Sequence, residues 1–290
     1  MVKSNPFNLR SNNTLVTLYS LKRNKFESVM RIPNSVRFSS LLFLFGILGC
    51  GVQPVIKQQG FIPINHRIAE DSITQGWINR YSDSLKKEMG VIIGQSQYYF
   101  QPVQTRGRVT EKSQSEATLA RLCADWTLLG SREWAKQSNH PEPQFALLNH
   151  FGLRKSIDSG QIQRGDIYEV MPFDNEVVLL ILKGSDISTL FDYIAKLGGT
   201  PIAGAELWIN DSTYSKAIIN GNSFDSRKSY CIATNDFMLG GGDGFNMLKN
   251  AKRITKTGIF LRDLFLNELK KESVANNGLL PRPTLRIHQP

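Results

Sequence analysis

The sequence contains little histidine and little cysteine. Only four histidines occur in 290 residues, and they are widely scattered, at His66, His140, His150 and His288. A two-metal catalytic centre needs several histidine and carboxylate ligands that converge at close range, and no Asp-x-His or Gly-Asn-His-Asp motif is present. We therefore predict no metal site and no catalytic residue in this chain, and we expect each histidine to lie at the surface or in a loop.

The three cysteines are Cys50, Cys123 and Cys231. Cys123 is expected on the apolar face of a helix and Cys231 in a strand, where free cysteines usually behave as small buried hydrophobic residues. A disulfide requires a specific approach of the two Cβ atoms. The sequence alone therefore leaves a bond between Cys123 and Cys231 open.

No apolar run reaches the length of about 20 residues that a membrane-spanning helix needs. The run at residues 41–48 follows Arg37 and ends at Gly49-Cys50, which is the pattern of a signal peptide that is cleaved before a lipid-modified cysteine. We expect a lipid on Cys50 to anchor the chain to a membrane of the bacterial cell envelope, on the periplasmic side or in the outer membrane.

The organisation of the chain follows from this pattern. Residues 1–29 are an unusual polar extension for a signal peptide, so we hypothesise that translation begins at Met30. The prediction is then a signal peptide at 1–49, with this mis-assigned upstream start, a lipidated cysteine and tether at 50–60, and a single folded domain at 61–290.

The positive charge is concentrated in the segment that is expected to be removed. The whole chain carries a net charge of +10, and its first 49 residues contain seven basic residues and one acidic residue, so cleavage leaves +4. A strongly basic chain would invite a nucleic-acid interpretation, but this remainder does not. We expect no nucleic-acid partner, and a mildly basic domain suits an anionic small molecule.

Apolar periodicity predicts helices and strands that interleave without a regular βαβ repeat. This favours an α+β fold, with a loop at 131–143 and a hairpin turn at Asn220-Gly221. The predicted helices are 69–89, 115–129, 185–197 and 257–271, and the predicted strands are 91–93, 145–148, 176–182, 207–209, 217–219 and 230–234.

The most distinctive motif is Ala233-Thr-Asn-Asp-Phe-Met-Leu-Gly-Gly-Gly-Asp-Gly, which joins a strand to a triple glycine. Gly241 and Gly242 allow a ligand to approach the backbone closely, Phe237 offers a stacking face, and Asp243 is an acceptor for hydroxyls or amines. A glycine cluster by itself is equally consistent with a tight turn.

Two further segments accompany this motif, Asn149-His-Phe-Gly-Leu-Arg-Lys-Ser-Ile and Gly165-Asp-Ile-Tyr-Glu-Val-Met-Pro-Phe-Asp-Asn-Glu-Val-Val. Together with matches at 116–125 and 183–190, they resemble the C-terminal domain of the 5′-nucleotidase family over roughly residues 70 to 288. The resemblance implies a layered α/β/β/α fold. It also implies a division of labour, in which an N-terminal metallophosphatase domain holds two metals and the C-terminal domain binds the nucleoside.

By the same resemblance, Phe173 and Phe237 sandwich the base, which stacking on aromatic rings permits for any base. Asn175 and Asp243 would bond the base edge or the sugar hydroxyls, and Arg154 would face phosphate. A phenylalanine after proline is also common in cores, and Asn or Asp beside glycine often serves its own turn.

The chain departs from the family pattern at three places. His150 and Phe151 replace two loop glycines, and Asp174 replaces the glycine of Pro-Phe-Gly-Asn, which puts the loop path in doubt and adds negative charge near any phosphate. Arg106 and Arg108 lie near, but out of register with, the family's additional phosphate-binding arginines.

The leading hypothesis is a nucleotide-binding domain of a split 5′-nucleotidase, active in nucleotide catabolism. A separate metallophosphatase subunit would supply the divalent metals, and this chain would bind no cofactor itself. The alternatives are a stand-alone nucleoside-binding lipoprotein and a degenerate relic that no longer binds. Autonomous catalysis is disfavoured by the scarcity of histidine.

Overall fold

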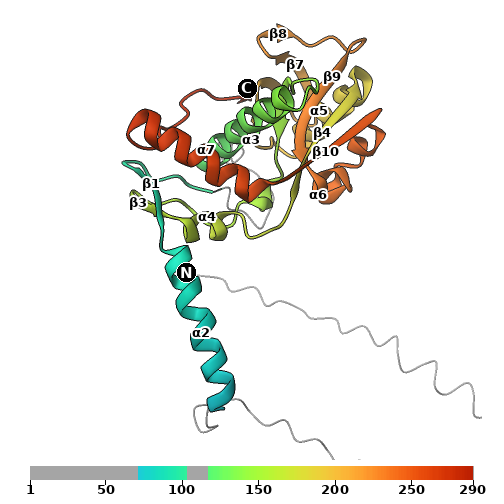
Figure 1. The fold of residues 1–290 in the computed structure, drawn as a ribbon. Coiled ribbons are helices and arrows are strands. Elements are labelled where there is room, and N and C mark those ends of the chain that lie inside the picture. The colour runs from blue at the N-terminus through green and yellow to red at the C-terminus, as the bar shows by residue number, and fades with distance from the viewer. Residues whose placement is uncertain (1–70, 103–116, 290) are drawn as a thin grey trace, which may run out of the picture. The chain divides into compact units, whose positions relative to one another are not determined.

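The computed structural model describes residues 71–102 and 117–289 (Figure 1). They belong to one compact unit, which spans residues 69–290. The predictions for residues 1–60, including Met30 and Cys50, and for Arg106 and Arg108 lie outside the described residues. Among the described helices, none combines the length and the apolar character that a membrane span requires.

The described residues form helices, short 3-10 turns and strands in the following order. The helices are α2 (Ser72–Met89), α3 (Thr118–Gln137), α4 (Arg164–Val170), α5 (Gly184–Lys196), α6 (Asp236–Leu239) and α7 (Leu261–Asn276), and the 3-10 turns are η2 (His150–Gly152), η3 (Gly242–Gly244) and η4 (Asn246–Asn250). The strands are β1 (Ile92–Ser96), β2 (Phe145–Leu147), β3 (Gly160–Gln163), β4 (Glu176–Lys183), β5 (Ile202–Ala203), β6 (Ala205–Asn210), β7 (Thr213–Ile219), β8 (Asn222–Ser223), β9 (Ser229–Asn235), β10 (Arg253–Phe260) and β11 (Ile287–His288).

These strands form three sheets. The largest has the order β10-β4-β9-β2-β5, a second has the order β11-β6-β7-β8, and β1 pairs with β3. In the largest sheet β4 runs antiparallel to β9, whereas β2 runs parallel to β9. The hairpin turn predicted at Asn220-Gly221 is present between β7 and β8, and both residues have positive φ, as the preferred turn type requires.

Both faces of the five-stranded sheet are covered. On one face, Val178, Leu180 and Leu182 of β4 share a core with helix α5 and with the four-stranded sheet. On the other face, Leu179 packs with residues of α3, and α7 lies alongside α3 (Figure 1). Successive residues of β4 thus point to opposite layers, as strand geometry dictates. The expected α+β class is confirmed as a mixed α/β fold with several sheets.

Helix α3 is longer than the sequence predicted. The prediction of a loop at 131–143 was wrong for residues 131–137, which continue the helix. The helix continues through Gly130, where a Cβ atom would lie 2.7 Å from Cγ of Leu264. Glycine at this position therefore allows α7 to approach α3 closely. Ser131 and Ala135 are buried, so the helix keeps an inward face beyond Gly130.

The predicted helix at 257–271 was wrong at its start. Residues 253–260 form strand β10, and α7 begins only at Leu261. Ile259 and Leu261 fit strand alternation, whereas Leu261, Leu264 and Phe265 recur at helical spacing, so periodicity alone could not place the boundary. Pairing with β4 decides it, and the Thr257 hydroxyl donates to the Val177 carbonyl at 2.8 Å.

Strand β3 and helix α4 were missed. The helix begins with a capping box, in which the Gln163 backbone N–H donates to the Asp166 carboxylate at 2.8 Å. The familiar signature of this box has Ser or Thr at the first position. Because Gln163 takes the first position here, the start of α4 could not be recognised from the sequence.

Cys123 and Cys231 are both free and buried. Burial raises the pKa of the Cys231 thiol to about 11 and raises the pKa of the Cys123 thiol well above its ordinary value. The Cys231 thiol donates to the Pro141 carbonyl at 3.4 Å. The open question of a disulfide between them is thus resolved against one, and the expectation of buried free thiols is confirmed.

A cluster of ion pairs holds the C-terminal segment against α3 and α7. Arg282 contacts Asp125 at 2.9 Å and Glu272 at 2.7 Å, and Arg286 contacts Asp125 at 2.7 Å. Burial opposes ionisation of Glu272, but hydrogen bonds from Arg282 and from the Trp126 indole outweigh it and keep the pKa of this carboxyl below its ordinary value. These contacts place β11 beside β6.

Candidate functional site

Three loops meet at one edge of the five-stranded sheet. Val177 near the start of β4 lies opposite Asn235 at the end of β9. Because β2 is parallel to β9, its end lies at the same edge. The loops that follow β2 and β9 and the turn that precedes β4 therefore converge there. We call this the strand-end edge, and it gathers the three sequence motifs that are separated along the chain.

Buried hydrogen bonds hold the strand-end edge together. The Asn235 side chain accepts from the Met238 backbone N–H at 2.9 Å, which caps α6, and donates to the Asn149 side chain at 3.3 Å. Next to it, the Asp236 carboxylate accepts from the Glu176 backbone N–H at 3.2 Å. Asn149 and Asn235 are both buried. Each of the three loops is thus bonded to another, which restricts their relative movement.

Phe173 and Arg154 are brought together. The Arg154 guanidinium lies 5.6 Å from the centroid of the Phe173 ring and donates to the Phe151 carbonyl at 3.2 Å. Phe173 keeps 39% of its surface exposed. The neighbouring cation Lys155 is bound by Glu169, which raises the pKa of the lysine. Arg154 is therefore the cation that lies beside the exposed ring.

Phe237 lies over the glycine loop. A Cβ atom at Gly242 would collide with the Phe237 ring, so glycine is required for the ring to lie in this position. Phe237 is the second residue of α6, after the Asn235 cap, and keeps 45% of its surface exposed. Within the described residues, the rings of Phe173 and Phe237 do not stack on each other.

The glycine loop has left-handed backbone at several positions. Gly241 has φ of 86°, and a Cβ atom there would lie 2.5 Å from the Asn246 side-chain oxygen. Asp243 has φ of 50° although it is not glycine, a conformation that Asp adopts more readily than most residues. The Asp243 carbonyl accepts from the Tyr193 hydroxyl at 2.8 Å, which fixes the loop. The Asp243 carboxylate has no hydrogen-bond or ion-pair partner within residues 71–102 and 117–289, and the residue is exposed.

Asn175 is positioned by its backbone. Its carbonyl accepts from the Leu261 N–H at 2.8 Å, at the first residue of α7. Its side chain is half-buried, at the end of the turn that carries Phe173. The structure thus places Phe173, Asn175, Phe237 and Arg154 on loops of the strand-end edge, and places Gly241, Gly242 and Asp243 in the loop that continues from it.

The negative charge of Asp174 is compensated by a residue that sequence reasoning missed. The Arg262 guanidinium contacts the Asp174 carboxylate at 2.5 Å and lies 4.4 Å from the centroid of the Tyr168 ring. Arg262 is largely buried, whereas Asp174 is exposed. An acid where the resemblance predicted glycine could have prompted a search for a nearby cation, but 88 residues separate the two in sequence.

The altered loop after β2 adopts ordinary backbone. Residues 150–152 form the 3-10 turn η2, and Phe151 does not have positive φ; neither does Asp174. The two changed positions therefore carry no left-handed strain. Phe151 is 45% exposed and lies in the same loop as Arg154.

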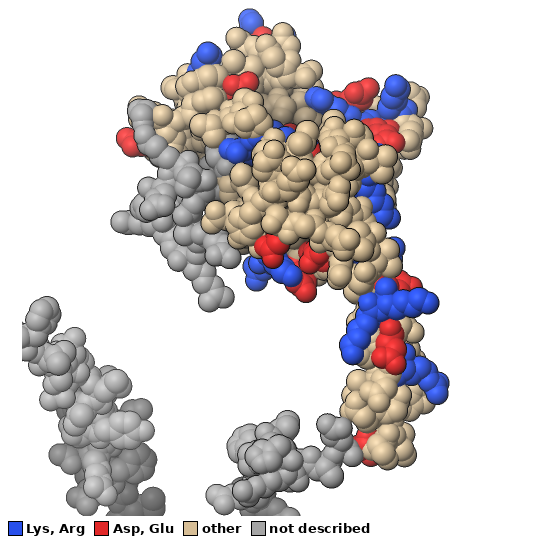
Figure 2. Space-filling view, turned by 90° about the vertical axis from the view of Figure 1, so that its left-hand side faces the viewer, with Lys and Arg blue, Asp and Glu red and all other residues tan. Residues whose placement is uncertain are grey.

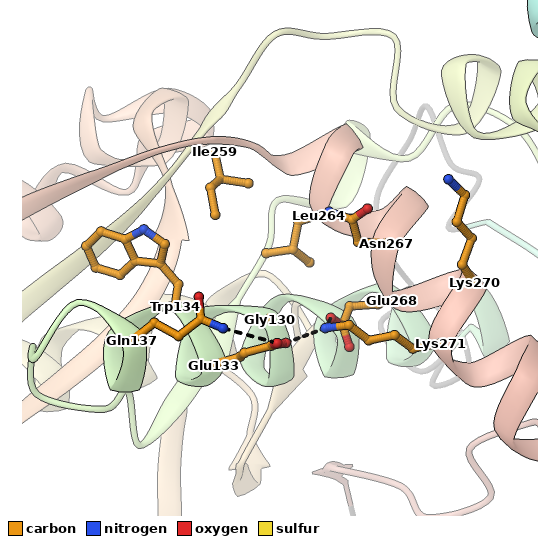
Figure 3. Close-up of a pocket in the computed structure, with 10 residues that line it drawn as sticks. All are labelled: Gly130, Glu133, Trp134, Gln137, Ile259, Leu264, Asn267, Glu268, Lys270 and Lys271. Carbon is orange, nitrogen blue, oxygen red and sulfur yellow. Dashed lines mark hydrogen bonds and ion pairs between the residues drawn. The ribbon is translucent and has the colours of Figure 1, made fainter.

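A hollow of about 430 Å³ lies elsewhere, between α3 and α7, and Figure 3 shows the residues that line it. Glu133 accepts from Gln137 at 3.4 Å and from Lys271, which also contacts Glu268 at 2.8 Å. The apolar side is formed by Trp134, Ile259 and Leu264. Glu133, Glu268 and Lys271 are thus paired with one another, and no residue of the strand-end edge that we predicted to bind ligand lines the hollow.

The described residues contain no group of three His, Cys, Asp or Glu side chains arranged to hold a metal ion. The side chains gathered at the strand-end edge are instead aromatic, amide, carboxylate and guanidinium groups. Such a set binds flat rings, hydroxyls and anions through stacking and hydrogen bonds.

Comparison with known proteins gives relatives of related architecture. Protein UshA of Escherichia coli (strain K12) is 27% identical over 184 residues, which cover 59% of this chain and 34% of UshA. The trifunctional nucleotide phosphoesterase protein YfkN of Bacillus subtilis (strain 168) is 24% identical over 244 residues, which cover 79% of this chain and 16% of YfkN. The chain thus spans about a third of the length of UshA, and less of YfkN.

Solved structures show the same fold. The 5′-nucleotidase precursor from Thermus thermophilus superposes with a TM-score of 0.59 at 23% identity, covering 76% of this chain and 43% of that one. Haemophilus influenzae NAD nucleotidase (NadN) also superposes with a TM-score of 0.59, at 15% identity. This superposition covers 90% of this chain and 46% of NadN.

A family model described as 5′-nucleotidase, C-terminal domain, matches residues 92–250, more than half of the chain. The match includes all three motifs of the strand-end edge and each residue that we predicted to bind substrate. The resemblance drawn from those motifs is confirmed: this protein belongs to the 5′-nucleotidase C-terminal domain family.

Proposed function

We propose that this domain binds the nucleoside part of a nucleotide between Phe173 and Phe237. The observation that carries the proposal is that two half-exposed rings, from segments more than 60 residues apart, are held at one edge by buried and partly buried hydrogen bonds. Stacking on an aromatic side chain contributes about 1–3 kcal/mol per base. Stacking of this kind gives affinity without demanding a particular base.

The polar groups around the rings have distinct roles in this proposal. Asn175 and Asp243 bond the base edge or the sugar hydroxyls, while Gly241 and Gly242 let the ligand approach the backbone. Arg154 faces the phosphate, where a guanidinium can engage two oxygens at once. The pairing of Asp174 with Arg262 supports this assignment, because it reduces the repulsion that a free carboxylate would exert on the phosphate.

The contribution of the domain is substrate recognition within a 5′-nucleotidase. Hydrolysis of the phosphate ester is assigned to a separately encoded metallophosphatase subunit that holds divalent metals, and this chain binds no cofactor. Support comes from the relatives, which are about three times as long as the region they share with this chain. A lipid on Cys50 would hold the assembly at the cell envelope. Labelling with a radioactive fatty acid should mark the wild type and leave Cys50→Ser unmarked.

Calorimetry with adenosine and with AMP tests the aromatic pair. Phe173→Ala or Phe237→Ala should each lower the affinity about tenfold or more, as the loss of one stacking face predicts. Trp77→Ala removes an equally exposed aromatic ring on helix α2 and serves as the matched control. If the wild type binds neither ligand, the proposal fails. Binding without any associated phosphatase would favour a stand-alone nucleoside-binding lipoprotein.

A further inference from the structure

Charges of both signs are mixed on the face of the domain that Figure 2 shows. Lys and Arg side chains there lie beside Asp and Glu side chains, and no broad patch of one sign forms. Near the strand-end edge, Lys155 pairs with Glu169, and Arg262 pairs with Asp174. Asp243 differs, because its carboxylate has no hydrogen-bond or ion-pair partner among the described residues. An unpartnered carboxylate beside a candidate binding site needs an explanation.

The backbone of the glycine loop explains why this carboxylate is free. An Asp side chain often bonds to the backbone N–H two residues further along its own turn. In this loop, the N–H at that position belongs to Phe245 and donates to the Gly242 carbonyl at 3.2 Å. The N–H of Gly244 donates to the Gly241 carbonyl at 3.1 Å. The two nearby donors are therefore already used by carbonyls of the loop.

The nearest cation along the chain does not take the carboxylate either. Lys249 follows in η4, and its ammonium donates to the Asn246 side-chain oxygen at 2.9 Å. The ammonium lies against Gly241, where a Cβ atom would be 2.6 Å from the lysine nitrogen. The Asp243 carboxylate is therefore available to a ligand.

Tyr193 holds Asp243 in a left-handed backbone conformation. Asp243 has φ of 50° and ψ of 25°. Residues other than glycine occupy this region rarely, and such a conformation persists only where surrounding contacts impose it. The contact here is the Tyr193 hydroxyl, which donates to the Asp243 carbonyl at 2.8 Å. Gly244 leaves room for that hydroxyl, since a Cβ atom at this position would collide with its oxygen.

Tyr193 is itself fixed by helix α5 and by the core. Its ring meets the ring of Phe245 edge-on, with the centroids 5.0 Å apart and the planes at 85°. Phe245 is buried, and α5 shares a core with β4 of the five-stranded sheet. The hydroxyl of Tyr193 therefore ties the exposed Asp243 to the packed interior of the domain.

The glycine loop also places Asp243 beside the ring of Phe237. That ring lies against Gly242, the residue directly before Asp243. In the proposed function the base stacks on this ring, so the attached sugar extends past the edge of the ring toward neighbouring residues. An ionised carboxylate accepts hydrogen bonds from hydroxyl groups and donates none. Asp243 therefore suits the two adjacent hydroxyls of ribose.

We propose that Tyr193 is a positioning residue, which sets the Asp243 carboxylate to accept from the ribose hydroxyls and so makes the site selective for ribonucleosides. Tyr193 acts through Asp243 and does not touch the ligand. This inference rests on the proposed function, in which the base stacks on Phe237. It adds a residue of helix α5 that lies outside the sequence motifs from which the site was predicted.

Calorimetry on the full chain in detergent compares adenosine with 2′,3′-dideoxyadenosine, which keeps the base and lacks both hydroxyls. The wild type should bind adenosine about tenfold more tightly, because hydrogen bonds to a charged group are the stronger ones. Tyr193→Phe removes the hydroxyl and keeps the ring that packs on Phe245. It should reduce this ratio to about threefold or less, while the affinity for dideoxyadenosine changes by less than about twofold.

Tyr214→Phe is the matched control. The Tyr214 hydroxyl forms a hydrogen bond of 2.8 Å with Ser188 of the same helix, where β7 rather than the glycine loop meets it. This variant should keep the full ratio between the two ligands. Circular dichroism confirms folding of each variant.

A double variant tests whether Tyr193 acts through Asp243. Asp243→Asn alone should remove most of the preference for adenosine. Tyr193→Phe/Asp243→Asn should then bind adenosine no more weakly than Asp243→Asn, as expected when two residues share one interaction. Losses that simply add would contradict the positioning role.

Two further outcomes would overturn the inference. The first is a wild type that binds adenosine and dideoxyadenosine equally, which would leave base stacking intact but remove the role of the hydroxyls. The second is a Tyr193→Phe variant that loses affinity for both ligands to the same extent, which would assign Tyr193 to the general structure of the loop. A wild type that binds neither ligand contradicts the proposed function itself, so the two failures are distinguished.

Discussion

The strand-end edge and the apolar face of helix α2 both expose aromatic rings, but they hold those rings in different ways. Phe173 and Phe237 lie beside strands whose ends are joined by one buried and one partly buried side-chain hydrogen bond. Trp77 and Tyr81 lie on a helix that buries none of its residues within the described part of the chain. Rigid positioning suits a small ligand, for which little binding energy is available to order the site.

The largest effect on stability should follow from removing the hydrogen bonds that hold the strand-end edge together. Asn235→Ala removes the α6 cap and leaves the Asn149 amide without its partner. We expect the free energy of unfolding to fall by about 2–4 kcal/mol, since both groups are buried. Urea denaturation measures the loss. Trp77→Ala on α2 should change stability by less than about 0.5 kcal/mol, and equal effects of the two substitutions would erase the distinction.

Raising the pH tests the stability of the strand-end edge without a substitution in it. Burial raises the pKa of Cys231, in the strand that leads to Phe237, to about 11 from an ordinary value near 9. The unfolded chain therefore loses this proton first, so stability is full below pH 9 and falls as pH rises toward 11. The loss reaches at most about 2–3 kcal/mol.

The control for this pH dependence is Cys231→Ala, whose stability should vary less between pH 9 and pH 11. Denaturation curves at several pH values make the measurement. If the wild type and the variant lose stability in parallel, another group is responsible for the alkaline effect.

The smallest expected effect is on the affinity for AMP and concerns the carboxylate of Asp174, the residue after Phe173. Arg262→Met frees the Asp174 carboxylate, which should then repel phosphate and lower the affinity for AMP about threefold, while adenosine binding changes less. Asp174→Asn in the same chain should restore AMP binding. Calorimetry on the wild type, the two single variants and the double variant gives the coupling between the two residues. Equal losses for AMP and adenosine would show that Arg262 acts through the loop structure instead.

The sequence predicted the three motif loops well because each is bounded by strong local signals. Phe173 follows a proline and precedes an apolar strand, and Phe237 lies between a strand end and three glycines. The pairing of β4 with β9 then brings the two loops together. The family resemblance implied this proximity, but apolar periodicity cannot predict which strands pair. Whether these residues bind a nucleotide stays a prediction.

The errors of prediction arose where long-range contacts override local pattern. Residues 131–143 were predicted as a loop from their prolines and polar residues, but 131–137 continue α3, and Leu264 of another helix packs against Gly130. Residues 257–260 have a spacing that fits both helix and strand, and pairing with β4 selects the strand. The pattern of α2 predicted its helix correctly, but no periodicity states whether an apolar face is covered.

The ion pairs of the C-terminal segment have a consequence for the order of folding during synthesis. Arg282 and Arg286 leave the ribosome after Asp125 and Glu272, so these two carboxylates lack their partners until the segment beyond α7 has been made. The four-stranded sheet also lacks its edge strand β11 until then. Helices α3 and α7 can therefore pack against each other early, but β6 gains its parallel partner β11, and Asp125 and Glu272 gain their cations, only when this late segment is in place.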